Sequence, residues 1–346
     1  MVHYIKLFFT WQYPDIHIFI FREAFLLDFF HAKTNSSYCS KELIFAICSF
    51  GCLLTDDPSR KSISFKFFQK ARELCFHNYY KPSISLLQSF LLLGLYEIYN
   101  GRNESGWFMS GIAMRMGYSI GLQLSPTDLM SDNAKGALGN KIRSRIFWGT
   151  YLVDHLIGLL LGRPSSLKMN DSTIEETIEL PDIDWMHEYS FQDKDRKRVK
   201  VLKIGDPLRA TVSLMDLTES MLKEVFNDKQ TNRKKKSVEL HEKLIVVKKY
   251  NSKILKWRKD LPTELLWNRA DLEKLGSDPT KLTFKLLYYI VLLCLNRPFL
   301  NLKSTENFPN YQYNFSRICS NAISDLAIVI RKFVQTYGFG KCSTLI

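Results

Sequence analysis

One serine lies in a pattern associated with nucleophilic catalysis. Gly117 to Gly121 read Gly-Tyr-Ser-Ile-Gly and match the G-x-S-x-G pattern of a nucleophile elbow, in which the serine occupies a strained turn between a strand and a helix. Such a serine also needs an acid and a histidine placed to activate it. Ser119 instead closes a segment with helical periodicity. We therefore interpret this pattern as small residues at a helix end and assign Ser119 no chemical role.

Two adjacent carboxylates, Asp56 and Asp57, are the residue type that holds magnesium in all-α isoprenoid synthases. A site of that kind needs a further carboxylate one helical turn along the chain. The sequence has Ser59 and Arg60 there. We expect a loop that ends a helix, followed by Pro58, rather than a metal site.

Thiols and an imidazole gather between positions 48 and 77. Cys48 and Cys52 lie about one helical turn apart, and Cys75 is separated from His77 by one residue. A structural zinc site combines two short ligand units at a defined spacing, and the remaining cysteines complete no such set. We expect these thiols to be buried as small hydrophobic groups.

His155 directly follows Asp154, and these residue types could serve as a base and its orienting acid. Neighbours on a helix point in different directions, so we expect the two side chains to have different partners. The chain also lacks a G-x-x-x-x-G-K-[ST] phosphate-binding sequence. We predict no catalytic, cofactor-binding or metal-binding residue in this chain, and no enzyme activity.

The composition is that of a folded protein whose positive charge is concentrated in one region. The 346 residues are 46% hydrophobic and 24% charged, with a net charge of +13. Residues 189–260 carry 20 Lys and Arg against 10 Asp and Glu, so the rest of the chain is nearly neutral. The overall charge therefore does not by itself indicate nucleic-acid binding. The longest apolar run, Leu286–Leu295, is about half of the roughly 20 residues that span a membrane, and we expect no membrane partner. Seven scattered cysteines exclude a disulfide framework.

The hydrophobic residues recur with helical spacing through most of the chain. This periodicity predicts an all-α fold, a helical array of roughly ten to twelve packed helices. Three apolar segments are expected at its centre: 83–99, 103–121 and 138–161. Further helices are predicted over 16–31, 40–54, 61–77, 207–226, 238–260, 263–274, 280–295 and 311–335.

Local signals predict how the first two central helices begin and pack. Ser85-x-x-Gln88 has the spacing of a capping box at the start of segment 83–99. In segment 103–121, one face is expected to carry Trp107, Gly111, Met114 and Tyr118, and Gly111 predicts a close approach to a neighbouring helix. Ser125-Pro126 predicts the start of another helix.

Polarity divides the chain into three parts. Residues 1–164 form an N-terminal helical part, 165–205 an acidic and then basic loop or hinge, and 206–346 a C-terminal helical part. We expect the two helical parts to act together as one domain.

A series of short motifs, in this order, resembles a known family. They include Tyr13-Pro14, Tyr38-Cys39-Ser40, Lys81-Pro82-Ser83, Gly106-Trp107, Gly111-Ile112-Ala113-Met114-Arg115, Tyr151-x-x-Asp154, Gly162-Arg163-Pro164, Trp257-x3-Leu261-Pro262 and Asn296-Arg297-Pro298-Phe299. In order and spacing they resemble the fungal-specific transcription factor domain, also called the xylanolytic activator regulatory domain. This domain is the middle region of zinc-cluster transcription factors. The resemblance covers nearly the whole chain and is closest in character to regulators of nitrogen assimilation.

The resemblance implies a regulatory domain that controls transcription by RNA polymerase II in the nucleus. The implied partners are a small-molecule effector, a second copy of the chain, and the transcriptional machinery or its co-regulators. The binuclear zinc cluster that reads DNA in this family needs paired C-x2-C-x6-C units, which this sequence lacks. Zinc and DNA are therefore expected only through a module absent from this chain, and a start at Met1 just before the opening motif suggests a fragment or a member without that module. Gln123, His155 and Asn296 depart from residues common in the family.

Three polar residues in apolar helices or at their ends, Arg115, Asp154 and Arg163, are the strongest candidates for a specific role. A buried charge needs a partner, so an internal salt bridge that pins two helices is one interpretation. The other is a ligand-contacting group in an apolar pocket. The full set of structural or regulatory candidates is Trp107, Gly111, Arg115, Asp154, Gly162, Arg163, Pro164, Arg297 and Pro298.

Two basic clusters lie in polar segments of the chain. They comprise Lys194, Arg196, Lys197 and Arg198, and then Arg233, Lys234, Lys235 and Lys236. Without interleaved aromatic residues or a recognition helix they could contact phosphates but not read bases. We predict weak, salt-sensitive DNA binding without sequence preference, and a role in nuclear import or simply a solvated loop. Two alternatives to the regulatory domain remain at this point: a non-catalytic dimerisation scaffold and an all-α enzyme.

Overall fold

The computed structural model describes residues 1–13, 17–31, 36–124, 134–169, 172–173, 205–226, 236–273, 279–300 and 314–341. Within these ranges the chain forms twelve α-helices and no strand, which confirms the predicted all-α array. The helices are α1 (Val2–Trp11), α2 (Arg22–Phe30), α3 (Lys41–Gly51), α4 (Arg60–Asn78), α5 (Ile84–Tyr99), α6 (Asn103–Ser119), α7 (Ala134–Leu161), α8 (Gly205–Met221), α9 (Lys236–Lys259), α10 (Arg269–Glu273), α11 (Pro279–Asn296) and α12 (Phe315–Tyr337). Short 3-10 or π turns cover Cys52–Leu54, Leu222–Phe226, Arg297–Phe299 and Phe339–Lys341.

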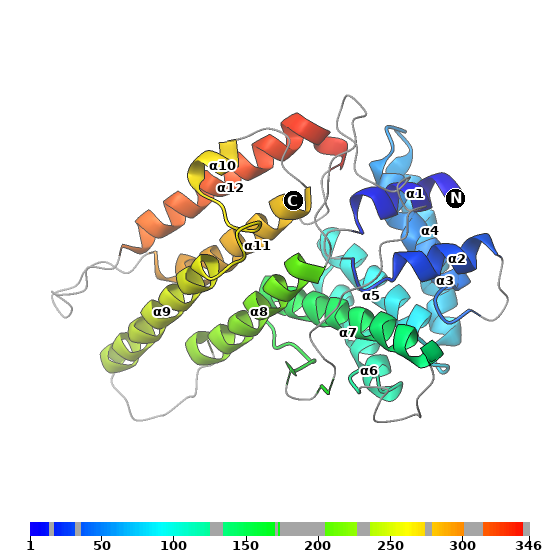
Figure 1. The fold of residues 1–346 in the computed structure, drawn as a ribbon, viewed down its shortest axis with the longest axis horizontal. Helices are drawn as coiled ribbons and strands as arrows, with labels where there is room; N and C mark the ends of the chain where they lie inside the picture. Colours follow the sequence, from blue (N-terminus) through cyan, green and yellow to red (C-terminus); the bar gives the residue numbers. More distant parts are fainter. Residues whose placement is uncertain are drawn as a thin grey trace.

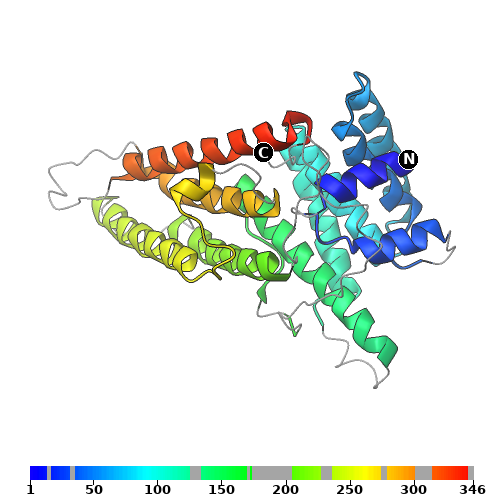
Figure 2. The same ribbon diagram turned by 45° about the horizontal axis from the view of Figure 1, so that its top comes forward.

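The long helix α7 lies between two groups of helices. Figure 1 shows α1 to α6 on one side of the molecule and α8 to α12 on the other. Turning the view shows the same division (Figure 2). Helix α7 packs against α6 at one side and against α8 at the other, and buried side chains from both groups join in one hydrophobic core. The cavity described below lies at this junction.

Helix α5 crosses the centre of the N-terminal group, as its apolar sequence predicts. Its N-cap is Ser83, whose Oγ accepts a hydrogen bond from the backbone N–H of Leu86 at 3.2 Å. The predicted capping box of Ser85 and Gln88 is therefore wrong. Gln88 is buried, and its Nε2 donates to the backbone oxygen of Phe19 at 2.8 Å, so its side chain serves packing between segments.

The close approach between α5 and α6 takes place at Gly94 and Gly106. A Cβ atom added to Gly106 would lie 2.7 Å from the backbone oxygen of Gly94 and 2.5 Å from Ile98 Cγ1. The same addition at Gly111 would meet nothing within 4 Å. The prediction that Gly111 makes the tight contact is wrong, because helical periodicity shows which residues share a face but not where that face touches its neighbour.

Three further boundaries differ from those expected. Helix α2 begins at Arg22 rather than near 16, and the preceding residues bury Phe19 and Phe21 without forming a helix. Helix α10 is short, because residues 261–268 form turns that bury Leu265 and Trp267. Helix α1 had no predicted counterpart. The expected helix start at Ser125-Pro126 and most of the expected hinge 165–205 lie outside the described residues.

Helix α11 is unusually apolar. The segment Lys281–Phe299 is long and apolar enough to cross a membrane by composition, but 67% of it is buried inside the protein. A core helix has these properties as well. Its C-terminal end, at Asn296, faces the junction with α7 and α8.

Candidate functional site

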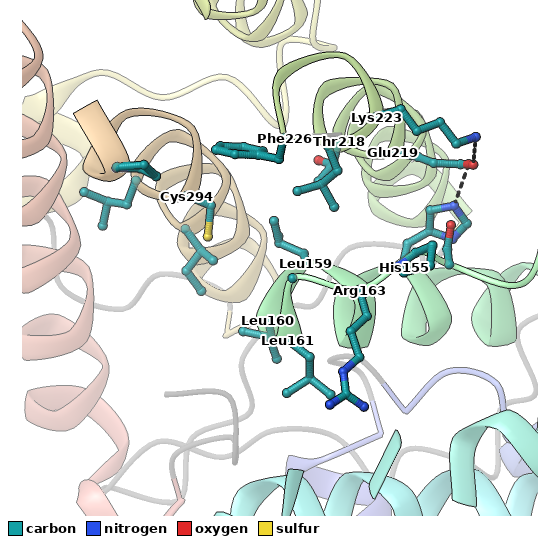
Figure 3. Close-up of a pocket in the computed structure, with 18 of the residues that line it drawn as sticks. His155, Leu159, Leu160, Leu161, Arg163, Thr218, Glu219, Lys223, Phe226 and Cys294 are labelled. Carbon is teal, nitrogen blue, oxygen red and sulfur yellow. Dashed lines mark hydrogen bonds and ion pairs between the residues drawn. The ribbon is translucent and has the colours of Figure 1, made fainter. Parts of the chain in front are cut away.

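A cavity of about 860 Å³ lies where α7, α8 and α11 meet (Figure 3). This volume is within the range of sites that bind small molecules, roughly 300–1,000 Å³. Figure 3 shows Leu159, Phe226 and Cys294 around the same space, one from each of the three chain segments. The walls are formed by His155, Gly158, Leu159, Leu160, Leu161, Gly162, Arg163, Pro164, Ser165, Thr218, Glu219, Leu222, Lys223, Phe226, Ile290, Leu293, Cys294, Arg297 and Pro298.

The end of α7 forms one wall because its sequence forces the chain to turn back. Gly162 has a φ of +64°, a left-handed conformation that glycine adopts without strain, and the N–H of Arg163 donates to the Gly158 oxygen at 2.9 Å. Pro164 then prevents the helix from continuing. A Cβ atom on Gly158 would lie 2.8 Å from the Arg163 oxygen, so glycine at this position lets the returning chain lie directly on α7.

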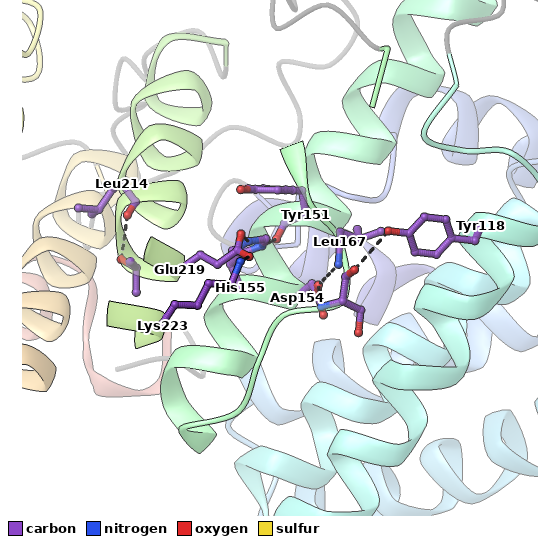
Figure 4. A network of polar contacts seen from close by, with 10 residues as sticks. Tyr118, Tyr151, Asp154, His155, Leu167, Leu214, Glu219 and Lys223 are labelled. Carbon is purple, nitrogen blue, oxygen red and sulfur yellow. Dashed lines mark hydrogen bonds and ion pairs between the residues drawn. The ribbon is translucent and has the colours of Figure 1, made fainter. Parts of the chain in front are cut away.

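Asp154 of α7 holds the chain that follows the helix, at Ser166 and Leu167, by hydrogen bonds. Its Oδ2 accepts hydrogen bonds from the backbone N–H groups of Ser166 at 2.6 Å and Leu167 at 2.7 Å (Figure 4). From α6, the Tyr118 hydroxyl donates to the backbone oxygen of Ser166 at 3.2 Å. Burial raises the pKa of Asp154 to about 6, against the effect of the two N–H donors. Among the described residues no ion pair joins Asp154 to an arginine, so the interpretation as a helix-pinning salt bridge is wrong for Asp154: backbone donors satisfy this carboxylate.

Arg163 lines the cavity, and its guanidinium has partners on α6. Its guanidinium pairs with Glu104 at the start of α6 and lies over the Trp107 ring, 5.3 Å from its centroid. In Figure 3 this group points away from Thr218 and Phe226. Arg163 therefore connects the cavity wall to α6. Arg115, the other arginine considered, is exposed on α6, so the expectation that it is a buried charge is wrong.

A second polar cluster closes the α8 side of the cavity. His155 Nε2 lies 3.0 Å from Glu219 Oε2, and Glu219 also pairs with Lys223. His155 Nδ1 lies 2.9 Å from the backbone oxygen of Tyr151, and the His155 ring stacks on the Tyr151 ring with 3.8 Å between the ring centroids. The hydrogen bond from His155, aided by Lys223, lowers the pKa of Glu219 to about 2. No short sequence pattern predicts this cluster, because His155 and Glu219 are 64 positions apart in the chain.

The end of α11 supplies the third wall. Asn296 is buried and exchanges amide hydrogen bonds with Asn251 of α9, each 2.9 Å long. This reciprocal pair fixes the position from which Arg297 and Pro298 enter the cavity lining. Burial raises the pKa of the Cys294 thiol, and the positive charge of Arg297 opposes this effect. Arg297 itself is exposed.

The structure thus brings together seven of the nine candidate residues. Gly162, Arg163, Pro164, Arg297 and Pro298 line the cavity although Arg297 follows Pro164 by 133 positions in the sequence. Asp154 and Trp107 contact residues of this wall: Asp154 accepts hydrogen bonds from Ser166 and Leu167, and the Trp107 ring lies under the Arg163 guanidinium. Gly111 and Arg115 lie on α6 outside this cluster. Both basic clusters lie outside the described residues, apart from Lys236 at the start of α9, whose side chain is not described.

The other residues considered for chemistry serve local structure. Ser119 is the exposed last residue of α6, so no strand-turn-helix surrounds it. Asp57 Oδ1 accepts from the N–H and Oγ of Ser59, at 2.7 and 2.6 Å. Burial raises the pKa of Cys48 to about 12 and of Cys52 to about 11, as expected for buried thiols. In the described ranges no three His, Cys, Asp or Glu side chains are grouped to hold a metal.

Comparison with known proteins identifies the family. Residues 5–259 match the fungal specific transcription factor domain. The TY1 enhancer activator of Saccharomyces cerevisiae is 36% identical over 96% of this chain and 42% of its own length. An uncharacterized transcriptional regulatory protein of Schizosaccharomyces pombe is 32% identical over 98% of this chain and 54% of its own. The nitrogen assimilation transcription factor nirA of Emericella nidulans is 26% identical over 97% of this chain and 37% of its own, which agrees with the resemblance noted above.

The chain spans about half the length of the curated relatives it matches. No solved structure matches it. The match to the family extends over α1 to α9 and includes two of the three segments that form the cavity. This chain belongs to the fungal-specific transcription factor domain family.

Proposed function

We propose that this chain is the regulatory domain of a fungal transcription factor and that a small molecule bound in the cavity between α7, α8 and α11 controls transcription by RNA polymerase II. The observation that carries the proposal is the convergence of Gly162-Arg163-Pro164 and Arg297-Pro298 on one cavity. These motifs come from opposite halves of the chain, so an occupant would contact both halves at once. The role proposed is binding, without catalysis.

The cavity wall offers a route by which an occupant would affect the rest of the domain. The segment 162–167 faces the cavity on one side and α6 on the other. It is tied to α6 through Arg163 with Glu104 and through Ser166 with Tyr118. An occupant that favours one position of this segment would favour the corresponding position of α6, and a ligand acts only through such a difference in affinity.

The remaining partners belong to the complete transcription factor. We propose that DNA is read by a zinc-cluster module outside this chain, that the domain acts in the nucleus, and that it contacts a second copy or co-regulators. The names of the relatives, an enhancer activator and a nitrogen assimilation factor among them, support this role.

A reporter assay tests the regulatory role. Residues 1–346 are placed between a heterologous DNA-binding domain and a heterologous activation domain in a fungal host, and reporter expression is compared across growth media with a fusion that lacks the chain. We expect expression to depend on the medium only when the chain is present. Equal expression from both fusions in every medium would contradict a regulatory role and leave the scaffold interpretation.

A further inference from the structure

We infer that the cavity binds an amphipathic carboxylate, with its apolar body between α7, α8 and α11 and its anionic head paired with Arg297. This inference rests on the proposed function and names the chemical class of the effector. A medium-chain fatty acid is the simplest member of that class. The charges, the walls and the polar groups of the cavity each support it.

The charges around the cavity leave one guanidinium available. Lys223 pairs with Glu219, and Arg163 directs its guanidinium to Glu104. Arg297 takes part in none of the ion pairs formed among the described residues, although it lines the cavity. A carboxylate is the group that a guanidinium binds with two parallel hydrogen bonds.

The walls between these charges are apolar. Leu159 comes from α7, Leu222 and Phe226 from the turn after α8, and Ile290 and Leu293 from α11. Burying a hydrocarbon chain against such side chains is favourable because it removes apolar surface from water. The cavity volume of about 860 Å³ leaves room for a chain of medium length.

Most polar side chains in the walls are already bonded within the protein, whereas Ser165 Oγ is buried without a hydrogen-bond partner among the described residues. Thr218 Oγ1 donates to the Leu214 oxygen at 2.8 Å, and both ring nitrogens of His155 face protein oxygens. A sugar or a nucleotide needs many free donors and acceptors, because unpaired polar groups are costly to bury. The cavity therefore favours a ligand with one charged end and few other polar atoms.

Calorimetric titration with decanoate, below its micelle-forming concentration, tests this inference on the full chain. We expect decanoate to bind the wild-type chain more tightly than decanol, its neutral counterpart. Arg297→Gln should weaken decanoate binding about tenfold or more, as the loss of hydrogen bonds between charged groups predicts, and should abolish the preference over decanol. Arg115→Gln removes an exposed arginine of α6 and should leave binding unchanged. Thermal denaturation of both variants verifies that they fold.

Two outcomes would overturn the inference: wild-type chain that does not bind decanoate, or equal weakening by Arg297→Gln and Arg115→Gln. Failure here is distinct from failure of the proposed function. If decanoate does not bind but a cavity-filling Leu293→Trp variant alters medium-dependent reporter expression, the cavity remains an effector site and only the carboxylate is rejected. A Leu293→Trp variant without any effect on the reporter would reject the site itself.

Discussion

The carboxylate of Asp154 accepts a 2.7 Å hydrogen bond from the backbone N–H of Leu167 and so ties the chain that follows α7 back onto that helix. The same oxygen accepts from Ser166, whose carbonyl contacts Tyr118 of α6. One buried side chain therefore fixes the segment that separates the cavity from the N-terminal helices. In the proposed function, an occupant of the cavity would act on α6 through this segment.

Removing the acceptor should destabilise the fold. Asp154→Ala leaves the buried N–H of Leu167 without a partner, which costs about 1–3 kcal/mol of unfolding free energy. Asp57→Ala is the matched control, because Asp57 also accepts from a backbone N–H but in an exposed turn, and little change is expected. Urea denaturation measures both. Equal midpoints for Asp154→Ala and the wild type would show that water replaces the carboxylate.

Asp154 and Glu219 should give opposite dependences of stability on pH. The folded pKa of Asp154 is about 6, above its ordinary value, so its contribution is full below about pH 4 and is lost as the pH rises to 6. The folded pKa of Glu219 is about 2, so its contribution is present above its ordinary pKa and is lost as the pH falls toward 2. Urea midpoints of Asp154→Asn should therefore decline less than wild type between pH 4 and 6. If the urea midpoint of Asp154→Asn falls as much as that of the wild type between pH 4 and 6, the pH dependence arises from another group.

Two glycines on α6 should respond in opposite ways to the same substitution. Gly106→Ala forces a Cβ atom against the backbone of Gly94 and should cost about 1–3 kcal/mol, as overpacking does. Gly111→Ala meets open space and should be neutral or stabilise the helix by about 0.5–1 kcal/mol. Thermal denaturation distinguishes them. A larger loss of stability for Gly111→Ala than for Gly106→Ala would show that the tight helix contact lies at Gly111 rather than at Gly106.

The fold was predictable from the sequence where the signal is local, and the site was predictable only in part. Helical periodicity located α5, α6 and α7 because their core is formed by residues three and four apart. The exposure of Arg115 was not predictable, since periodicity does not show which side of α6 is covered. The partners of Asp154 are backbone groups, which carry no side-chain signature. The pairing of His155 with Glu219 depends on how α7 packs against α8, which no short pattern encodes.

The two basic clusters should matter for transport rather than for stability. Replacing Lys194, Arg196, Lys197 and Arg198, and then Arg233, Lys234, Lys235 and Lys236, with glutamine should reduce nuclear accumulation of a fluorescently tagged chain. The thermal midpoint should stay nearly unchanged. Undiminished nuclear accumulation would show that import depends on another segment or on a partner. Tight, salt-resistant binding of one DNA sequence by the wild-type chain would contradict the prediction that these clusters contact only phosphates.

In the proposed function, the cavity between α7, α8 and α11 is the effector site of a transcription regulatory domain. The most direct test of this role is reporter expression from the three-part fusion carrying Leu293→Trp, which fills the cavity, compared with Leu255→Trp on the exposed surface of α9. Both variants add the same volume, and their thermal midpoints verify folding. We predict that Leu293→Trp abolishes the dependence of expression on the growth medium and that Leu255→Trp preserves it. Medium-dependent expression that is unchanged in a folded Leu293→Trp variant would contradict this role.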